Sequence, residues 1–493
     1  MASTVVSGVL GLVRTMYIVH LFGAGAVTDA YWAAFQLPDM INYFLVGGVA
    51  SISLVTILSR YRQAGDEEGG DCTLSVVLNG MLIVLGVGIV LGAIFAPAYT
   101  RAWFPKFDPQ RAALCTSLTR VLLPAQLFFF AGGVLGSRLL VRKIFLYQAV
   151  TPLLYNIGII AGAWLLSARF GIYSLAIGVL AGAFVGSVVI NVIGAYRNGM
   201  RYRLLFNLRD AAFVEWLKLS LPLMIGVSLV MADKWLLAYF ASGDTGAISR
   251  LSVAKTLFNA PLGILGQAAG AASLPFFAAL FSQGRMEDFA AAVNRSASRL
   301  IAVSLLAAAW MIALAGPIVD LIRGGSFSRM DAKQTATYFA IFSLSIALWV
   351  AQAFYARAFY AAGNTRVPAT TGWIVTLASI PVYRILFLKM GIVGLAIASD
   401  VGILAMTVAL AVMLDRRRLV PLSGLEGAEM GRALMAAGVG FAGAAACVRF
   451  LPVPGGHPGD VLMIGAGSVA WGALCLGVLM ATGSSLPRQL WRS

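Results

Sequence analysis

The sequence has few charged residues, few cysteines and almost no histidine. Charged side chains make up 11% of its 493 residues and hydrophobic ones 60%, a balance too apolar for a soluble globular protein. The four cysteines are far apart and form no CxxC pair, so neither a disulfide framework nor a cysteine metal site is expected. Two histidines also exclude a histidine-rich metal site. These residues are Cys72, Cys115, Cys447, Cys475, His20 and His457.

The common enzyme signatures are missing as well. The chain has no GxSxG, HExxH or Walker loop, no GxGxxG in a strand-to-helix setting, and no soluble stretch long enough for an ATPase domain. We therefore expect neither an enzyme nor a cofactor. The net charge of +16 comes from cations scattered over short loops, with no long basic arm, so nucleic acid is not an expected partner.

Long apolar runs are what the chain does have. They predict an all-α polytopic membrane protein, because many reach the roughly 20 residues that a spanning helix needs and none shows the alternation of barrel strands. We predict fourteen spans: 3–22, 30–58, 73–99, 112–137, 145–167, 171–195, 214–241, 248–281, 296–322, 334–361, 367–388, 391–414, 430–451 and 460–482.

Lys and Arg are distributed unequally between alternate loops. The loops near 60, 140, 203, 290, 366 and 417, together with the C-terminal tail, carry 18 of these residues, against 10 in the opposite connections. Because cytoplasmic loops are enriched in Lys and Arg, both termini are predicted to be cytoplasmic.

A weak internal repeat relates the two halves of the chain. Leu21 to Gly25 corresponds to Tyr239 to Gly243 at an offset of 218, and each segment precedes a long span that ends near a basic loop. The repeat predicts two six-helix lobes in parallel orientation, with a substrate site between them. The expected divisions are an N-lobe, 1–205, a C-lobe, 206–418, and two accessory helices, 419–493.

Several charges interrupt the apolar runs of the opening spans of both halves. Arg14 lies in span 1, Lys234 in span 7, and Arg250 and Lys255 in span 8. A charge inside a membrane bundle must face the protein interior or a wet cavity, and cations from both halves that converge would bind a phosphate group. Purely structural alternatives are local pairs of Arg14 with Asp29 or Asp39, pairs of Lys234 with Asp233 or Asp400, and snorkelling of Arg250.

Two carboxylates in the apolar runs are candidate ion-coupling groups. Asp233 is either the counter-ion of a cation or a ligand of a coupling proton or sodium ion. Asp400, which follows Ser399, serves either helix packing or ion binding. The glycine stripe Gly178-x3-Gly182-x3-Gly186 predicts close packing of span 6 on a neighbouring helix.

The N-terminal residues carry a resemblance to a known family. Ser7 to Arg14, Leu21 to Tyr31 and Phe35 to Asp39 resemble the signature of the MurJ (MviN-type) lipid II flippases, in the multidrug/oligosaccharidyl-lipid/polysaccharide exporter superfamily. Pro261 to Gly266 and Gly363 to Pro368 are similar to later parts of the family pattern.

The resemblance implies two six-helix lobes around a cationic central cavity. It also implies a tail groove on spans 13 and 14, and alternating access that flips lipid II across the bacterial inner membrane. By resemblance, Arg14 and Asp29 are substrate-site residues, and Asp233 is an aspartate that helps bind sodium in some members. The implied partners are lipid II, which is an undecaprenyl-pyrophosphate-linked glycan, together with membrane lipids and cell-wall synthesis proteins, and the implied state is a monomer.

The chain departs from the family pattern at several charged or polar positions. Family arginines of spans 1 and 2 are replaced, the Asp-Arg pair of span 8 reads Lys255-Thr256, and two positions that supply sodium ligands carry a serine and a tyrosine. The departures are Gly8, Asn42, Tyr43, Gly47, Thr256, Ser379 and Tyr383.

These departures leave alternatives open. Besides a lipid II flippase, the sequence permits an exporter of another polyprenyl-pyrophosphate-linked glycan, a multidrug antiporter, or a membrane scaffold for envelope synthesis that transports nothing. The expected energy source is a coupling cation or the membrane potential, and sodium dependence is expected to be weak.

Overall fold

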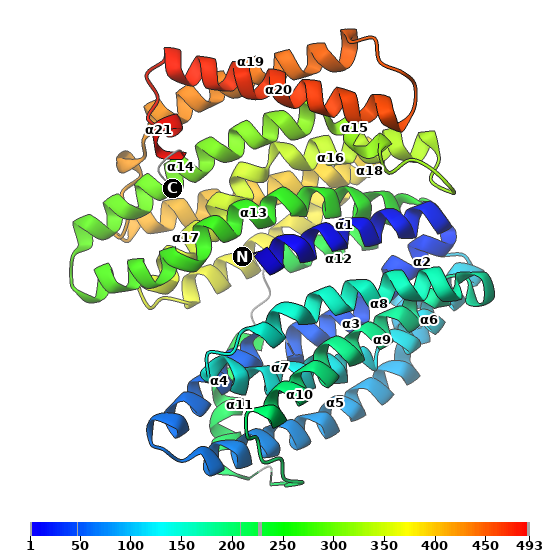
Figure 1. Ribbon diagram of the computed structural model, residues 1–493, viewed down its shortest axis with the longest axis vertical. Helices are drawn as coiled ribbons and strands as arrows, with labels where there is room; N and C mark the ends of the chain where they lie inside the picture. Colours follow the sequence, from blue (N-terminus) through cyan, green and yellow to red (C-terminus); the bar gives the residue numbers. More distant parts are fainter. Residues whose placement is uncertain (1, 47, 208, 225–228, 491–493) are drawn as a thin grey trace. The chain divides into compact units, whose positions relative to one another are not determined.

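The computed structural model describes residues 2–46, 48–207, 209–224 and 229–490 (Figure 1). Side chains are described there except at 2–5, 45, 46, 48–52, 221–224, 230, 267–272, 489 and 490. Gly47 lies outside the described residues. The elements are α1 (Ala2–Phe22), α2 (Ala26–Ala34), α3 (Gln36–Ile41), the π-helix η1 (Asn42–Val46), α4 (Gly48–Gln63), α5 (Glu67–Trp103), α6 (Pro109–Leu122), α7 (Ala125–Val141), α8 (Leu146–Phe170), α9 (Tyr173–Ala183), the π-helix η2 (Phe184–Val189), α10 (Ile190–Arg197), α11 (Ala211–Met224), α12 (Leu229–Ala241), α13 (Ala247–Ser282), α14 (Met286–Ala313), α15 (Ala315–Asp320), α16 (Arg329–Leu344), α17 (Ile346–Ala361), α18 (Arg366–Arg416), the 3₁₀ helix η3 (Leu422–Gly424), α19 (Gly427–Phe450), α20 (His457–Ala481) and α21 (Leu486–Leu490).

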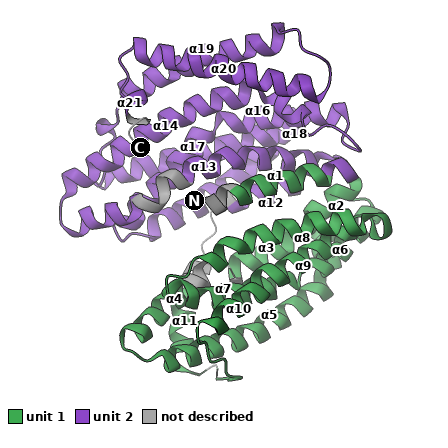
Figure 2. Cartoon of the chain, viewed as in Figure 1, with its two compact units in different colours: residues 1–18, 25–226 green, residues 19–24, 227–493 purple. Residues whose placement is uncertain are grey.

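The chain forms two compact units (Figure 2). Unit 1 comprises residues 1–18 and 25–226, and unit 2 comprises residues 19–24 and 227–493. Helix α11 belongs to unit 1, and the accessory helices α19 and α20 belong to unit 2. The division into 1–205, 206–418 and 419–493 stays a prediction.

The predicted all-α class is confirmed for the described residues. They contain helices and a single isolated bridge between Gly324 and Phe327, and no strand. Eight of the described helices or joined helices are long and apolar enough to cross a membrane, or nine if α16 and α17, bent by 44°, form one span. The protein is therefore polytopic, and the count of fourteen spans stays a prediction.

Several predicted spans are broken helices. The predicted span 30–58 is divided into most of α2, then α3, η1 and most of α4, and α6 meets α7 at Pro124. Proline lacks the backbone N–H that continues a helix, and π-helical turns are local irregularities of the helical ladder. Breaks of this kind are tolerated in a bilayer where protein buries the freed backbone groups.

The helix boundaries repeat between the two halves at an offset of 219 or 220 residues. Helices α5 and α14 begin at Glu67 and Met286, 219 positions apart, whereas α6 and α16 begin at Pro109 and Arg329, 220 apart. Helices α8 and α18 begin at Leu146 and Arg366, also 220 apart. The architecture of α1–α10 is thus repeated in α12–α18.

One glycine marks the repeat in backbone conformation. Gly171 follows α8 with φ 51° and ψ −133°, and Gly391, 220 positions later, divides α18 into 366–390 and 392–416 with φ 60° and ψ −138°. This region is nearly closed to residues with a Cβ. Both glycines begin the sequence Gly-Ile-x-x-Leu-Ala-Ile, so the same turn chemistry ends the fifth predicted span of each half.

The predicted close packing at the glycine stripe is confirmed in unit 1. A Cβ added at Gly158 of α8 would lie 2.5 Å from the Cα of Gly182, and one added at Gly162 would lie 2.7 Å from the Cα of Gly178. Glycines on both partners therefore let the backbones of α8 and α9 touch.

The accessory helices pack on α14. Trp471 of α20 donates its indole N–H to the carbonyl of Leu306 at 3.0 Å, and Trp310 of α14 donates to the hydroxyl of Ser468 at 2.8 Å. Buried alanines of α14 and α19 fill the interface. Gly440 also serves packing, because a Cβ there would lie 2.4 Å from the sulfur of Cys475. All four cysteines of the chain are free.

Candidate functional site

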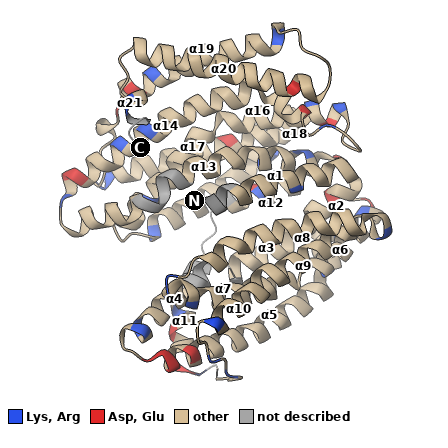
Figure 3. Cartoon of the chain, in the orientation of Figure 1, with Lys and Arg blue, Asp and Glu red and all other residues tan. Residues whose placement is uncertain are grey.

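Most Lys, Arg, Asp and Glu positions lie at helix ends and in loops of each unit, and fewer lie in the middle of a helix (Figure 3). Those few are costly to bury and are therefore the first candidates for function. Among the described residues, no three His, Cys, Asp or Glu side chains come together as metal ligands. Among the described residues, some of these internal charges gather in a polar cluster of unit 1 and others in a polar cluster of unit 2.

In unit 1, Arg14 of α1 is held by an amide of α8. Its Nη1 donates to Oδ1 of Asn156 at 3.0 Å. The Nδ2 of Asn156 donates to the carbonyl of Pro152 at 2.9 Å and lies 3.5 Å from the hydroxyl of Ser7 on α1. A neutral amide orients the half-buried guanidinium without neutralising its charge.

Two phenols, one buried and one half-buried, lie within electrostatic range of Arg14. They are Tyr31 of α2 and Tyr155 of α8. Tyr31 is fixed by an edge-to-face contact with Phe35, with ring centroids 5.1 Å apart. Asp39 of α3 is in range of Tyr155. The cluster therefore combines a guanidinium with phenol donors, which suits the oxygens of an anion.

Asp29 is completely buried in the first turn of α2. Its backbone N–H donates to the carbonyl of Gly25 at 2.9 Å. A carboxylate in the first turn interacts favourably with the helix dipole, so Asp29 stabilises the start of α2. Its role in substrate binding stays a prediction.

In unit 2, four side chains form what we term the Asp233 cluster: Asp233 of α12, Lys255 of α13, and Tyr383 and Ser399 of α18. The Nζ of Lys255 lies 2.9 Å from Oδ2 of Asp233 and donates to the hydroxyl of Ser399, also at 2.9 Å. Tyr383 donates its hydroxyl to Oδ1 of Asp233. Tyr383 and Ser399 lie on opposite sides of Gly391, so the cluster joins both segments of α18 to α12 and α13.

Aromatic rings cover the ammonium group of Lys255. Its Nζ lies 4.1 Å from the ring centroid of Phe342, 5.0 Å from that of Trp349 and 5.5 Å from that of Phe258. The negative face of each ring attracts a cation. Lys255 thus contacts both oxygen atoms and aromatic rings.

Asp400 lies beside the Asp233 cluster. Its Oδ1 accepts a hydrogen bond from the hydroxyl of Ser345 at 2.6 Å, and it is in electrostatic range of Lys255 and Asp233. The structure therefore brings together four of the residues that the sequence singled out: Lys255, Asp233, Ser399 and Asp400. Their roles in substrate binding and ion coupling stay predictions.

The other two predicted cations lie elsewhere in unit 2. The side chain of Lys234 is exposed on α12. Arg250 is buried, and its Nη1 lies 3.0 Å from Oδ1 of Asp331 while Nη2 donates to the carbonyl of Thr245 at 3.1 Å. Arg250 therefore ties the start of α13 to the start of α16, and a role in substrate binding stays a prediction for both cations.

Sequence reasoning missed two residues with buried polar groups. Tyr383 was noted only as a departure from the family pattern, yet it donates to Asp233. Arg357 is partly buried in α17, and its Nη1 lies 3.4 Å from the carbonyl of Gly266 on α13. A lone charge within the predicted span 334–361 is the signal that would have identified Arg357.

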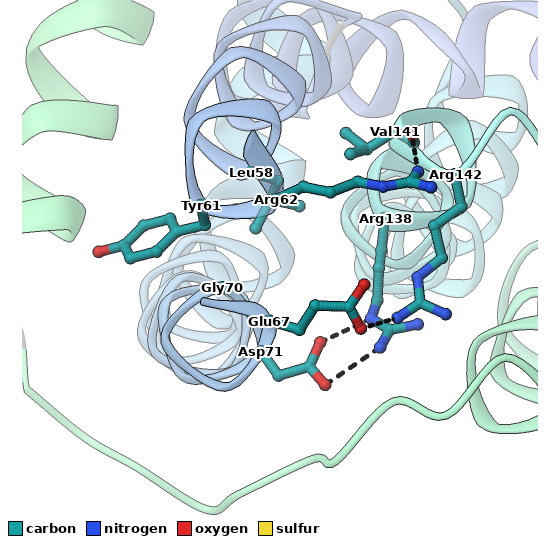
Figure 4. Close-up of a pocket in the computed structure, with 9 residues that line it drawn as sticks. All are labelled: Leu58, Tyr61, Arg62, Glu67, Gly70, Asp71, Arg138, Val141 and Arg142. Carbon is teal, nitrogen blue, oxygen red and sulfur yellow. Dashed lines mark hydrogen bonds and ion pairs between the residues drawn. The ribbon is translucent and has the colours of Figure 1, made fainter. Parts of the chain in front are cut away.

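A pocket at one end of unit 1 was also missed. It encloses an empty volume of about 310 Å³ between α4, α5 and α7 (Figure 4). Asp71 pairs there with Arg138 through two contacts, 2.6 Å to Nε and 3.1 Å to Nη2, and Arg142 pairs with Glu67. The backbone N–H of Arg201 also donates to Asp71, at 2.9 Å. The hydrogen bond from Arg201 to Asp71 therefore holds the loop after α10 against α5. We term this bond and the pair of Asp71 with Arg138 the clamp.

The corresponding end of unit 2 has a groove with a longer and more exposed ion pair, in which Nε of Arg295 lies 3.9 Å from Oε1 of Glu426. It has an empty volume of about 890 Å³ and lies between the start of α14 and the loop after α18. Ala290 and Ala358 stand 219 and 220 positions after Asp71 and Arg138. Here Asn294 donates to the carbonyl of Pro421 at 2.8 Å, so a neutral amide holds the loop.

Comparison with known proteins decides the family. The family model of the lipid II flippase MurJ matches residues 18–452, most of the chain. The chain belongs to the lipid II flippase MurJ family. Among curated relatives, the probable lipid II flippase MurJ of Vibrio cholerae is 25% identical over 421 residues, covering 81% of this chain and 79% of the relative. That of Bdellovibrio bacteriovorus is 26% identical over 431 residues, covering 84% and 80%.

Solved structures agree with this MurJ membership at the level of the fold. A structure described as lipid II flippase MurJ in an inward closed conformation has a TM-score of 0.81 at 21% identity and covers 97% of this chain and 98% of its own. An inward-facing multidrug transporter of the MATE family in the MOP superfamily has a TM-score of 0.69 at 16% identity, with coverages of 84% and 94%. At these identities the likeness concerns the fold alone.

Proposed function

We propose that the protein is a flippase that translocates lipid II, the lipid-linked peptidoglycan precursor, by alternating access. The MurJ match over residues 18–452 and the curated relatives, each aligned with about four fifths of the chain, support this function. The protein is then a transporter and not an enzyme.

The observation in the structure that supports an anionic cargo best is the contact of Arg14 with Asn156. A guanidinium binds a pyrophosphate with charge-assisted hydrogen bonds, which are among the strongest noncovalent interactions available to a side chain. An acidic partner would neutralise Arg14, whereas Asn156 only orients it. Arg14 thus keeps its positive charge for a phosphate group.

The accessory helices are proposed to hold the lipid tail. Gly438 of α19 and Gly465 and Gly472 of α20 have open space where a Cβ would stand, unlike Gly440. Open glycine positions leave shallow hollows on a helix surface, which an isoprenoid chain can fill. This assignment rests on the MurJ resemblance and on these open positions.

The proposed location is the inner membrane of a bacterium, with both termini in the cytoplasm. The 18 Lys and Arg residues in one set of loops, against 10 in the other, support this orientation. The proposed working state is a monomer that contacts membrane lipids and cell-wall synthesis proteins.

A second candidate cargo is another polyprenyl-pyrophosphate-linked glycan. Gly8, Asn42, Tyr43 and Thr256 stand where the MurJ resemblance implies charged side chains. Fewer charges at the headgroup would suit a different glycan, while Arg14 still binds the pyrophosphate that both cargoes share. Vesicles that contain the protein and one of the two lipids distinguish these candidates. Only the true cargo should cross the bilayer faster than it does in vesicles without protein.

Complementation tests the proposal in cells. In a bacterium whose own lipid II flippase is depleted, the wild-type chain should restore growth, and a scaffold that transports nothing should not. Arg14→Ala and Asn156→Asp should both fail at normal membrane levels, because the first removes the cation and the second neutralises it.

The matched control is Arg169→Ala, which removes an exposed arginine from the end of α8. It should restore growth fully. Growth with Asn156→Asp at the wild-type rate would contradict the assignment of Arg14 to the cargo.

A further inference from the structure

We infer that Lys255 is the built-in counter-ion of Asp233 and takes the place of a coupling sodium ion, so that this chain binds no sodium at Asp233. The inference rests on the proposed function for its transport readout, but its ion-binding readout is independent of the cargo.

Both oxygens of Asp233 are already occupied. Oδ2 lies 2.9 Å from the ammonium nitrogen of Lys255, and Oδ1 accepts a hydrogen bond from the hydroxyl group of Tyr383. A hard cation needs several oxygen ligands whose lone pairs face it. Tyr383 instead presents its proton to the carboxylate, so it acts here as a donor and not as a ligand.

The remaining oxygens near Asp233 fit a lysine better than a metal ion. Ser399 accepts a hydrogen bond from Lys255 at 2.9 Å, and Oδ1 of Asp400 accepts one from Ser345 at 2.6 Å. Ser379, at a position where the resemblance implies a sodium ligand, donates to the carbonyl of Val375 on its own helix at 2.7 Å. A sodium ion beside Asp233 would stand next to an ammonium group in a buried site, where repulsion between like charges is strong. With Lys255 in place, the site at Asp233 therefore does not fit sodium.

The ring faces explain why the fixed cation is an ammonium group. Phe342 and Trp349 lie against the ammonium group of Lys255, with their ring centroids 4.1 and 5.0 Å from Nζ. Rings attract an ammonium group but supply no oxygen ligand. The ammonium group of Lys255 thus donates to Asp233 and Ser399 and also contacts the rings. These interactions stabilise a cation that is covalently part of the chain.

This arrangement separates ion binding from transport. In a sodium-coupled site, the ion enters and leaves and thereby links the conformational cycle to the gradient. A lysine that is covalently part of α13 stays with the protein in every conformation. We therefore infer that transport by this chain proceeds without sodium and that the membrane potential or the cargo gradient supplies the driving force.

Sodium binding by the purified full chain tests the inference. The measurements are retention of radioactive sodium in equilibrium dialysis and the midpoint of thermal unfolding as sodium replaces N-methyl-D-glucamine at constant ionic strength. The wild type should retain no sodium and show no shift of the midpoint. A ligand that binds only the folded state would raise the midpoint.

Lys255→Met is the informative variant, because it removes the ammonium group and keeps an apolar side chain of similar length. This variant should bind sodium, and its thermal unfolding midpoint should rise with the sodium concentration. Adding Asp233→Asn to the same variant should abolish both effects. Lys389→Met, which removes an exposed lysine of α18, is the matched control and should behave as the wild type.

Sodium binding by the wild type that Asp233→Asn removes would overturn the inference, and this result does not depend on whether Lys255→Met folds. A folded Lys255→Met that ignores sodium would overturn it as well. In vesicles the wild type should flip its cargo equally with and without sodium. Failure to flip in both media would contradict the proposed function, while the binding experiment would still decide the assignment of Lys255.

Discussion

The two units repeat one architecture but use opposite charges at matching helices. Helix α1 of unit 1 presents Arg14 to a neutral amide of α8, whereas α12 of unit 2 presents Asp233 to Lys255 of α13 and to Tyr383 of α18. Asp233 stands 219 positions after Arg14, the spacing of the repeat. One half thus keeps a cation ready for an anion, and the other keeps an anion that is already neutralised.

The difference shows how a repeated fold divides two tasks. Backbone geometry is shared, as the matching turns at Gly171 and Gly391 show. Side chains within that geometry are free to differ, because the helices are held by apolar packing at many positions. Polar clusters can therefore specialise in each half without a change of fold.

The largest effect is expected at the end of unit 1 that carries the pair between Asp71 and Arg138. Asp71→Ala leaves Arg138 buried without its carboxylate, and should cost about 3–5 kcal/mol. The double change to alanine at both positions makes unit 1 resemble unit 2 there and should recover part of this loss. Thermal unfolding in detergent measures both. A single variant as stable as the wild type would show that the clamp contributes nothing.

A somewhat smaller loss is expected at the Asp233 cluster. Lys255→Met leaves Asp233 without its counter-ion but still bonded to Tyr383, so the cost should be about 3 kcal/mol, at the low end for a broken buried pair. Adding Asp233→Asn removes the uncompensated charge and should restore most of the stability. Unfolding midpoints in sodium-free buffer give both values. A double variant that is less stable than Lys255→Met would contradict the pairing.

Next in size is the contrast between two glycines that occupy equivalent positions, 220 residues apart. A Cβ at Gly182 would lie 2.8 Å from the carbonyl oxygen of Tyr155, whereas one at Gly402 would lie 3.3 Å from the hydroxyl of Ser379. Backbone cannot move aside as a side chain can. Gly182→Ala should therefore cost about 1–3 kcal/mol, and Gly402→Ala less. Equal unfolding midpoints for the two variants would refute the contrast.

The smallest effect is expected at the equivalent N-caps, Asp108 before α6 and Ser328 before α16. Ser328→Ala should cost about 1 kcal/mol. The backbone N–H of Arg111 donates to Asp108 and lowers the pKa of its carboxyl below the usual 3.8.

A lowered pKa has a defined consequence for stability. The contribution of Asp108 is complete above its unfolded pKa and is lost as the pH falls through the lower folded pKa. Amide exchange at the start of α6 should therefore accelerate in acid, and Asp108→Asn should remove this pH dependence. An acid effect that persists in Asp108→Asn would mean that another group causes it.

The sequence predicted the helices well because apolar runs and glycine positions are local signals. It also selected Asp233, Lys255, Ser399 and Asp400, since charges and their neighbours in apolar runs are visible in the sequence. The pairing was missed. A local pair of Lys234 with Asp233 or Asp400 was the structural alternative to a role in substrate binding. Adjacent residues on a helix point in different directions, however, and Lys255 reaches Asp233 from the next helix.

Other features depend on contacts between distant segments. The pairs of Asp71 with Arg138 and of Arg14 with Asn156 join residues 67 and 142 positions apart. The periodicity of apolar residues within one helix does not predict which other helix packs on its faces. The π-helical breaks at η1 and η2 were also missed, because such turns have no distinctive amino-acid composition.

The central claim is that Arg14 binds an anionic lipid-linked cargo that the protein carries across the membrane. Its most direct test is the transfer of fluorescent lipid II between leaflets of vesicles that contain the purified chain, in sodium-free buffer. We predict transfer by the wild type and by Arg169→Ala, and none above empty vesicles with Arg14→Ala or Asn156→Asp. Transfer by Arg14→Ala at the wild-type rate, or no transfer by the wild type, would contradict the account.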